Sequence, residues 1–228
     1  MTTQNPVIAL VSAVTAAIAP ATEAFASEYP DASVWNILDD RLLVDADARG
    51  GVTADLDERM ARLIRHAAIE GADGILLTCS LYGTVAHRLA AEIGVPLMAP
   101  DDALFAAVAD GGFGSILLLS PAPGPLAESA GRLTEHLRAA GRATTVTGVA
   151  VDGAADAARS GDLDRLVSAL EAAYLSASAS VDAVVLGQYS LSPAAEALSE
   201  RIGVRVLAGP GRAARALRSL IEQRGSGK

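Results

Sequence analysis

The sequence predicts an α/β fold made of two similar, doubly wound lobes. Short runs rich in Val, Ile and Leu alternate with longer segments of helical periodicity, which is typical of parallel sheets covered by helices. In addition, residues 73–98 and 182–207 repeat one unit at an offset of 109 positions. The identical residues are Asp73, Leu77, Ala86, Leu89, Ile93, Gly94 and Val95, which recur as Asp182, Leu186, Ala195, Leu198, Ile202, Gly203 and Val204. Such a repeat predicts two equivalent halves.

Strands and helices are predicted in alternation. The predicted strands are residues 7–14, 33–38, 74–79, 95–99, 115–120, 143–149, 183–188 and 204–208. The predicted helices are residues 20–28, 53–70, 82–93, 101–109, 126–140, 162–176, 193–201 and 212–223. Helix ends carry the expected signals, because acidic residues follow Thr53 in a first turn, and Gly71 and Gly141 follow helices as stops.

The two halves begin alike, because Val7–Ser12 resembles Ser115–Ser120 at an offset of 108 and both strands end in serine. We therefore expect an N-terminal lobe of residues 1–100 plus 208–228 and a C-terminal lobe of residues 101–207, related by pseudo-twofold symmetry. Ligands of open α/β sheets bind outside the carboxyl ends of the strands. The sequence therefore predicts an active site in the cleft between the lobes.

The bulk composition excludes several classes of partner. The chain has 228 residues, of which 51% are hydrophobic and 20% charged, as in an ordinary globular protein. Its net charge of −9, without any basic run, opposes binding to nucleic acid or to anionic lipid. No apolar run is long enough to span a membrane. A single cysteine suits a reducing compartment, so we expect a cytoplasmic protein.

The scarce residue types argue against a bound cofactor or metal. The one lysine, Lys228, is the last residue, a poor position for a Schiff base to pyridoxal phosphate. The three histidines, His66, His87 and His136, are far apart and are expected at the surface, so they form no recognisable metal-ligand set. These counts argue against pyridoxal phosphate and against a metal site made of His and Cys ligands, whereas a magnesium site made only of carboxylates stays open, without a motif to support it.

Cys79, the only cysteine, follows a predicted strand and precedes a predicted helix. A helix N-terminus favours the thiolate, and Ser80 with the neighbouring amides is placed to bind a carboxylate or an oxyanion. The alternative is that Cys79 is a small buried core residue. In the second copy Gln188 takes its position. Ser12 and Ser120 end strands, where a hydroxyl can bind a substrate carboxylate or satisfy a local turn.

Four segments carry a family resemblance: ILLTCSLYG after EGAD, VDAVVLGQYSLSPA, IGVPL and IGVRVLAGP. Together with NILDDRLLVD they resemble the aspartate/glutamate racemase superfamily, which includes hydantoin racemases, maleate isomerases and arylmalonate decarboxylase. The resemblance implies two Rossmann-like lobes, no cofactor and a homodimer. It also implies one cysteine from each lobe, facing opposite sides of the substrate α-carbon. Cys79 matches the first cysteine, whereas Gln188 stands at the second.

Gln188 changes the expected chemistry, because an amide neither gives nor takes a proton usefully at neutral pH. We predict a cofactor-independent enzyme in which Cys79 is the acid/base at the carbon next to a carboxylate, in a one-sided reaction. The residues expected to hold the small carboxylate substrate are Ser12, Ser80, Ser120, Gln188, Tyr189 and Ser190.

Three alternatives remain open from the sequence. The first is a decarboxylase or lyase of the arylmalonate decarboxylase type, since that enzyme also works with one cysteine, on the other lobe. The second is a non-catalytic module that binds carboxylates, motivated by the missing second thiol. The third is a hydrolase with Cys79 as nucleophile, which predicts a trapped acyl adduct.

Overall fold

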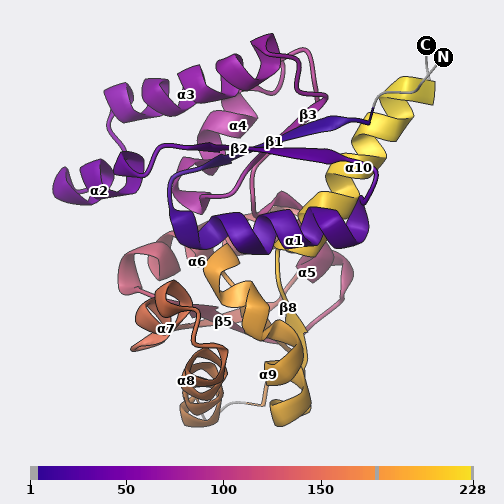
Figure 1. Cartoon of the computed structure of the whole chain (residues 1–228). Coiled ribbons are helices and arrows are strands. Elements are labelled where there is room, and N and C mark those ends of the chain that lie inside the picture. Colours follow the sequence, from indigo (N-terminus) through magenta and orange to yellow (C-terminus); the bar gives the residue numbers. More distant parts are fainter. Residues whose placement is uncertain (1–4, 178–179, 227–228) are drawn as a thin grey trace. The chain divides into compact units, whose positions relative to one another are not determined.

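The computed structural model describes residues 5–177 and 180–226, so Lys228 lies outside the described residues (Figure 1). The chain divides into two compact units, each with its own sheet. Unit 1 comprises Met1–Asp102 and Pro210–Lys228, and unit 2 comprises Ala103–Gly209. Both sheets are four-stranded and parallel, which confirms the predicted α/β class.

The sheet of unit 1 has the strand order β2-β1-β3-β4. Its strands are β1 (Val7–Ser12), β2 (Ser33–Leu38), β3 (Gly74–Leu77) and β4 (Leu97–Met98). The helices of this unit are α1 (Ile18–Glu28), α2 (Arg41–Ala48), α3 (Ala54–Ile69), α4 (Gly83–Leu89) and α10 (Pro210–Ser226). Two short 3-10 helices complete it, η1 (Thr15–Ala17) and η2 (Ser80–Tyr82).

Unit 2 repeats the same strand order, as β6-β5-β7-β8. Its strands are β5 (Ser115–Ser120), β6 (Thr145–Ala150), β7 (Ala183–Leu186) and β8 (Arg205–Leu207). The helices are α5 (Asp102–Asp110), α6 (Pro123–Ala139), α7 (Ala154–Ser160), α8 (Leu163–Ser176) and α9 (Ala195–Ile202), with the 3-10 helix η3 (Tyr189–Ala194).

Both faces of the unit 1 sheet are covered by helices (Figure 1). Because side chains alternate along a strand, Val11 and Leu77 point to one face, where they pack with residues of α3 and α4 such as Met60. On the other face the helix α10 approaches β3 so closely that a Cβ at Gly74 would lie 2.7 Å from Ile221 Cδ1. A parallel sheet buried on both faces explains the continuous apolar strand sequences.

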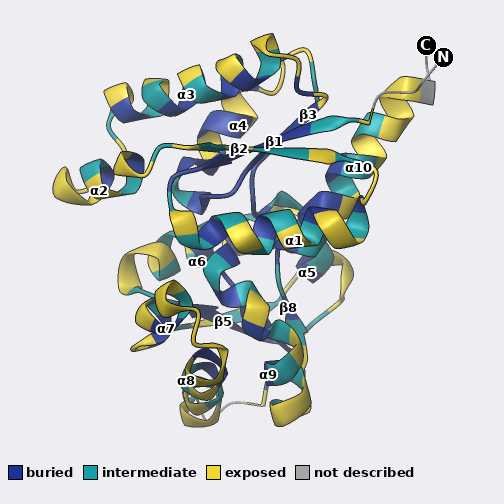
Figure 2. Ribbon diagram, in the orientation of Figure 1, coloured by how far each residue is buried: buried dark blue, intermediate teal, exposed yellow. Residues whose placement is uncertain are grey.

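The sheet of unit 2 is also buried on both faces. Leu119 packs with residues of α8 and α9, including Leu170 and Leu198. Leu118, its neighbour on the strand, packs instead with Phe105 of α5 and residues of α6. Buried residues lie along the strands and on the helix faces turned towards them (Figure 2).

The duplication extends through most of the chain. The helices α3 and α8 begin at Ala54 and Leu163, 109 positions apart, and the parallel pairing of β3 with β4 recurs at the same offset between β7 and β8. The helices α2 and α7 were not predicted, because each is short, with 8 and 7 residues, and buries only two side chains. Strands β3 and β7 end at Leu77 and Leu186, two residues earlier than predicted. No helix in the described ranges is long and apolar enough to cross a bilayer.

Candidate functional site

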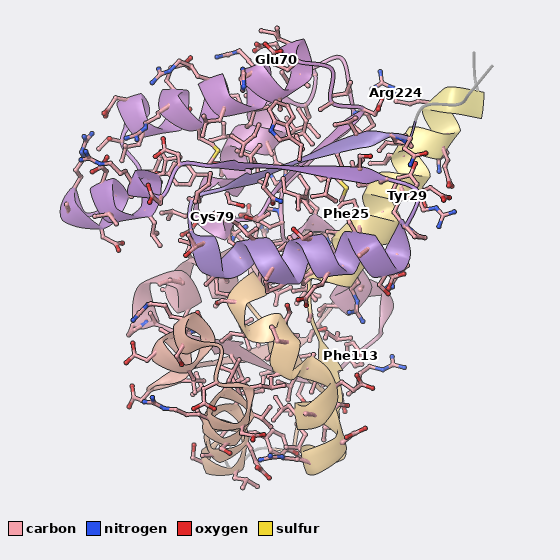
Figure 3. All side chains as sticks on the ribbon, in the orientation of Figure 1. Phe25, Tyr29, Glu70, Cys79, Phe113 and Arg224 are labelled. Atoms are coloured by element: carbon pink, nitrogen blue, oxygen red, sulfur yellow. The ribbon has the colours of Figure 1, made fainter. Side chains whose placement is uncertain are left out.

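Cys79 lies just beyond the carboxyl end of β3 (Figure 3). It is the N-cap residue of η2, with an extended backbone of φ −116° and ψ 115°. Its side chain belongs to the hydrophobic cluster of unit 1 and is 7% exposed. The thiol therefore stands at a strand end, as predicted, but it is packed among apolar neighbours.

Tyr82, at the end of η2, is a buried neighbour of Cys79. Its hydroxyl donates a hydrogen bond to the Leu42 carbonyl at 2.8 Å. Burial first, and then the negative charge of the Cys79 thiolate, raise the pKa of Tyr82 to about 12. The phenol therefore stays protonated near neutral pH and is no acid/base partner for the thiol.

Ser12 meets a residue that the sequence analysis missed, Thr78. The two hydroxyl oxygens lie 2.8 Å apart, and both side chains are buried. Ser12 ends β1 and Thr78 immediately precedes Cys79, so parallel pairing of β1 with β3 brings them together. The sequence does carry a signal for this contact, because a serine and a threonine follow the apolar residues of the two neighbouring strands β1 and β3.

Ser80 binds a second missed residue, Asp101. The Ser80 hydroxyl donates to Asp101 Oδ1 at 3.0 Å, and both side chains are buried. Asp102, the next residue, accepts a hydrogen bond from the Ala99 amide and pairs with His87 Nε2 at 2.7 Å. The segment before α5 is thus joined to η2 and α4. Because Ser80 gives its hydroxyl proton to Asp101, that proton is not available to a substrate in this arrangement.

A charged cluster lies at the same edge of the unit 1 sheet. The Asp39 amide donates to the Ser12 carbonyl at 3.0 Å, which places Asp39 beside β1. Arg59 of α3 donates to both Asp39 oxygens at 2.6 and 2.7 Å and to Asp45 at 3.0 Å. Hydrogen bonds and charge from Arg41 and Arg59 lower the pKa of Asp45. The Arg59 charge is therefore compensated by carboxylates, and we assign it no role towards the thiol.

Gln188 occupies the matching place in unit 2. It is the N-cap residue of η3, with an extended backbone of φ −136° and ψ 145°, and its side chain is half-buried. Ser120 is buried at the end of β5, and its hydroxyl donates to the Ala122 carbonyl at 3.4 Å. Tyr189 is buried and Ser190 half-buried. Within each unit, the predicted residues stand at or next to strand ends.

A hollow of about 630 Å³ in unit 1 lies elsewhere. It is lined by residues 90–97 of the segment around β4 and by Leu220, Gln223 and Arg224 of α10. Residues 93–96 lead into β4, whereas Cys79 follows β3, and the two strands are parallel. The hollow is therefore at the opposite edge of the sheet and contains none of the predicted site residues.

The described part of the chain contains no group of three or more His, Cys, Asp or Glu side chains arranged to hold a metal ion. His87, which the sequence places at the surface, is exposed there and pairs with Asp102.

The comparisons with known proteins concern the family and the fold of the chain. The sequence profile of the Asp/Glu/Hydantoin racemase family matches residues 11–217. The chain belongs to this family of enzymes. A search of curated protein sequences finds no match.

Solved structures with the same fold include enzymes of several specificities. An aspartate racemase from Picrophilus torridus is 16% identical over 95% of this chain and 94% of its own, with a TM-score of 0.70. A glutamate racemase isoform from Bacillus anthracis is 14% identical over 97% of this chain and 84% of its own, with a TM-score of 0.75.

A third similar structure is a liganded double mutant of arylmalonate decarboxylase, in which a glycine is replaced by cysteine and a cysteine by serine. It is 19% identical over 95% of this chain and 92% of its own, with a TM-score of 0.62. At such identities the likeness establishes the fold.

Proposed function

We propose that this protein is a cofactor-independent enzyme that transfers a proton at the carbon next to a carboxylate, with Cys79 as the acid/base. Membership of the racemase family gives the general class of reaction. The observation that carries the proposal is the position of Cys79. It directly follows the buried strand β3 and caps η2, at the edge of a parallel sheet where ligands of α/β proteins bind.

The proposed reaction is one-sided because Gln188 stands where the repeat would place a second thiol. In the first half-reaction the thiolate takes the α-proton and leaves an enediolate, whose negative charge is spread over the carboxylate oxygens. Returning a proton to the same face of that carbon regenerates the substrate and only exchanges its α-hydrogen with solvent. Net conversion on one face therefore requires that the enediolate arise by loss of carbon dioxide, as in the second candidate function below, or be protonated at another carbon. Gln188 can hold an enediolate oxygen through its two N–H donors, but cannot serve as the opposing base.

The substrate we propose is a small carboxylate held by the polar groups at the strand ends. These are Ser12, Ser120, Gln188, Tyr189 and Ser190. Ser80 contributes its backbone amide, since its hydroxyl is given to Asp101, and Ser120 exchanges its long 3.4 Å bond to the Ala122 carbonyl for the carboxylate. Family resemblance alone supports a homodimeric assembly.

Decarboxylation is the second candidate function. It is favoured by the presence of one cysteine and by the similarity to arylmalonate decarboxylase. In that reaction the carbon–carbon bond to one carboxylate breaks and carbon dioxide leaves. The electron pair of the broken bond stays on the α-carbon and forms an enediolate, which takes a proton from the Cys79 thiol. Cys79 would act only as an acid in this half-reaction, and solvent would restore its proton.

A panel of carboxylates in deuterium oxide tests both candidates. We would incubate the protein with aspartate, glutamate, maleate and phenylmalonate, and follow deuterium incorporation, isomerisation and loss of carbon dioxide by mass spectrometry and NMR. We expect turnover of at least one compound by the wild type and at least a 1,000-fold loss in Cys79→Ser, on the order expected when an acid/base group is removed. Wild-type rates in Cys79→Ser would reject the assignment.

The buried state of Cys79 favours the alternative of a binding module that has no turnover. Alkylation by iodoacetamide separates the two ideas, because the chain has no other cysteine. An enzyme is expected to show a reactivity midpoint below that of a free thiol, about 8.5. A midpoint at or above that value, together with binding but no turnover across the panel, would favour the module.

A further inference from the structure

The buried hydroxyl pair beside Cys79 carries more donors than it uses. Ser12 is 0% exposed and Thr78 is 4% exposed, and their oxygens share one hydrogen bond of 2.8 Å. Each hydroxyl has one proton to donate, so the pair has two donors and one internal bond. Among the described residues neither hydroxyl makes a second hydrogen bond. One buried O–H is therefore left for an acceptor from outside.

The pair exists only in the unit that holds the thiol. The repeat places Gly187 opposite Thr78, and a Cβ at Gly187 would lie 3.2 Å from Leu118 Cδ1 and 3.3 Å from the Leu119 carbonyl. The equivalent serine, Ser120, donates to the nearby Ala122 carbonyl at 3.4 Å. The difference between Thr78 and Gly187 thus accompanies the difference between Cys79 and Gln188 at the very next positions.

We propose that Thr78 is a substrate-positioning residue, which with Ser12 forms a two-hydroxyl donor for one oxygen of the substrate carboxylate. This inference rests on the proposed function and names a group within the same site. When Thr78 donates to Ser12, the Ser12 proton is free for the carboxylate, and when Ser12 donates to Thr78, the Thr78 proton is free. The pair therefore keeps one O–H for the carboxylate whichever hydroxyl donates within it, and no change of side-chain rotamer is needed.

The energetic reason is the cost of a buried donor without an acceptor. That cost is removed when an ionised oxygen accepts the spare proton, and hydrogen bonds to charged groups are stronger than those between neutral groups. Binding of a carboxylate oxygen therefore gains the hydrogen bond that the spare proton can make.

Protection of Cys79 from iodoacetamide tests the proposal without any need for turnover. Malonate is the probe, and the measured quantity is the malonate concentration that halves the alkylation rate. We expect this concentration to rise at least tenfold in Thr78→Val, which keeps the side-chain shape but loses the hydroxyl. It should change less than twofold in Thr78→Ser, which keeps the hydroxyl. Thr147→Val, on the exposed side of β6, is the control and should behave as wild type.

A stability measurement distinguishes positioning from packing. The double variant Ser12→Ala/Thr78→Val removes both buried hydroxyls together, so we expect its Tm to be no lower than that of wild type while protection by malonate is lost. A lower Tm together with unchanged protection would assign the pair to packing and overturn the proposal. Protection by malonate that is equal in wild type and Thr78→Val, or absent in wild type, would also overturn it. Absence of turnover across the carboxylate panel with protection intact would instead reject the enzyme and leave the carboxylate site.

Discussion

Tyr82 offers a test of the environment beside the thiol through the pH dependence of stability. Its hydroxyl is fully buried and donates to the Leu42 carbonyl. Replacement by Phe keeps the ring and removes the donor, so near neutral pH we expect the free energy of unfolding to fall by about 1–3 kcal/mol.

At high pH this difference should shrink. The folded protein holds the pKa of Tyr82 at about 12, whereas the unfolded chain ionises near the ordinary value of 10.0. Since the unfolded state loses its proton first, the stability that Tyr82 contributes is complete below pH 10 and is lost as the pH rises towards 12. At 1.36 kcal/mol per pKa unit, the advantage of wild type over Tyr82→Phe should fall by about 1.3 kcal/mol between pH 9 and pH 11.

Urea unfolding of both proteins at pH 7, 9, 10 and 11 measures these differences. The same series on Cys79→Ser measures how much the thiolate charge contributes to the raised pKa of Tyr82. This contribution should be smaller than that of burial. A difference between wild type and Tyr82→Phe that stays constant from pH 9 to pH 11 would refute the reasoning, because it would show that Tyr82 titrates alike in both states.

Three further predictions address packing, chemistry and surface charge. Gly74→Ala should be less stable than Gly131→Ala, because the new Cβ at Gly74 displaces Ile221 and lies 3.3 Å from Leu217 Cδ1, whereas Gly131→Ala in open space on α6 should raise the free energy of unfolding by about 0.5–1 kcal/mol. Urea unfolding that ranks the two variants otherwise would contradict the packing of α10. Gln188→Cys should supply the second thiol and raise the rate of racemisation of any substrate that wild type converts at least tenfold, measured by chiral chromatography. A product that remains a single enantiomer would argue against Gln188 as the residue opposite Cys79. The pKa of Asp55 is lowered to about 2, first by its hydrogen bond from Thr53 and then by Arg49. Wild type should therefore be more stable than Asp55→Asn above pH 4 and lose this advantage as the pH falls towards 2. Equal free energies of unfolding of the two proteins at pH 6 would contradict the pairing.

The repeat made the fold predictable from the sequence. Strands that are buried on both faces of a sheet consist of continuous runs of Val, Ile and Leu. The offset of 109 residues aligned the runs of the first half of the chain with those of the second half. Elements with few buried positions, such as α2 and α7, gave no comparable signal. The position of Cys79 after β3 followed from the same periodicity, since a strand end is fixed by where its apolar run stops.

The partners of the site residues were not predictable in the same way. Asp101 is 21 positions from Ser80 and Thr78 is 66 positions from Ser12, and only the folded chain brings each pair together. The burial of Cys79 was also not predictable from the sequence, because it depends on a cluster to which residues of α3 and η2 contribute rather than on the local sequence pattern. Sequence periodicity gives the edge of the sheet on which a residue lies, and tertiary packing decides what it touches.

The most direct test of proton transfer by Cys79 is the product formed from phenylmalonate in deuterium oxide. If decarboxylation is the reaction, wild type releases carbon dioxide and yields phenylacetate with one deuterium on a single face of the α-carbon, and the rate in Cys79→Ser is at least roughly 1,000-fold lower. Deuterium distributed equally over both faces, or wild-type yield from Cys79→Ser, would contradict the account.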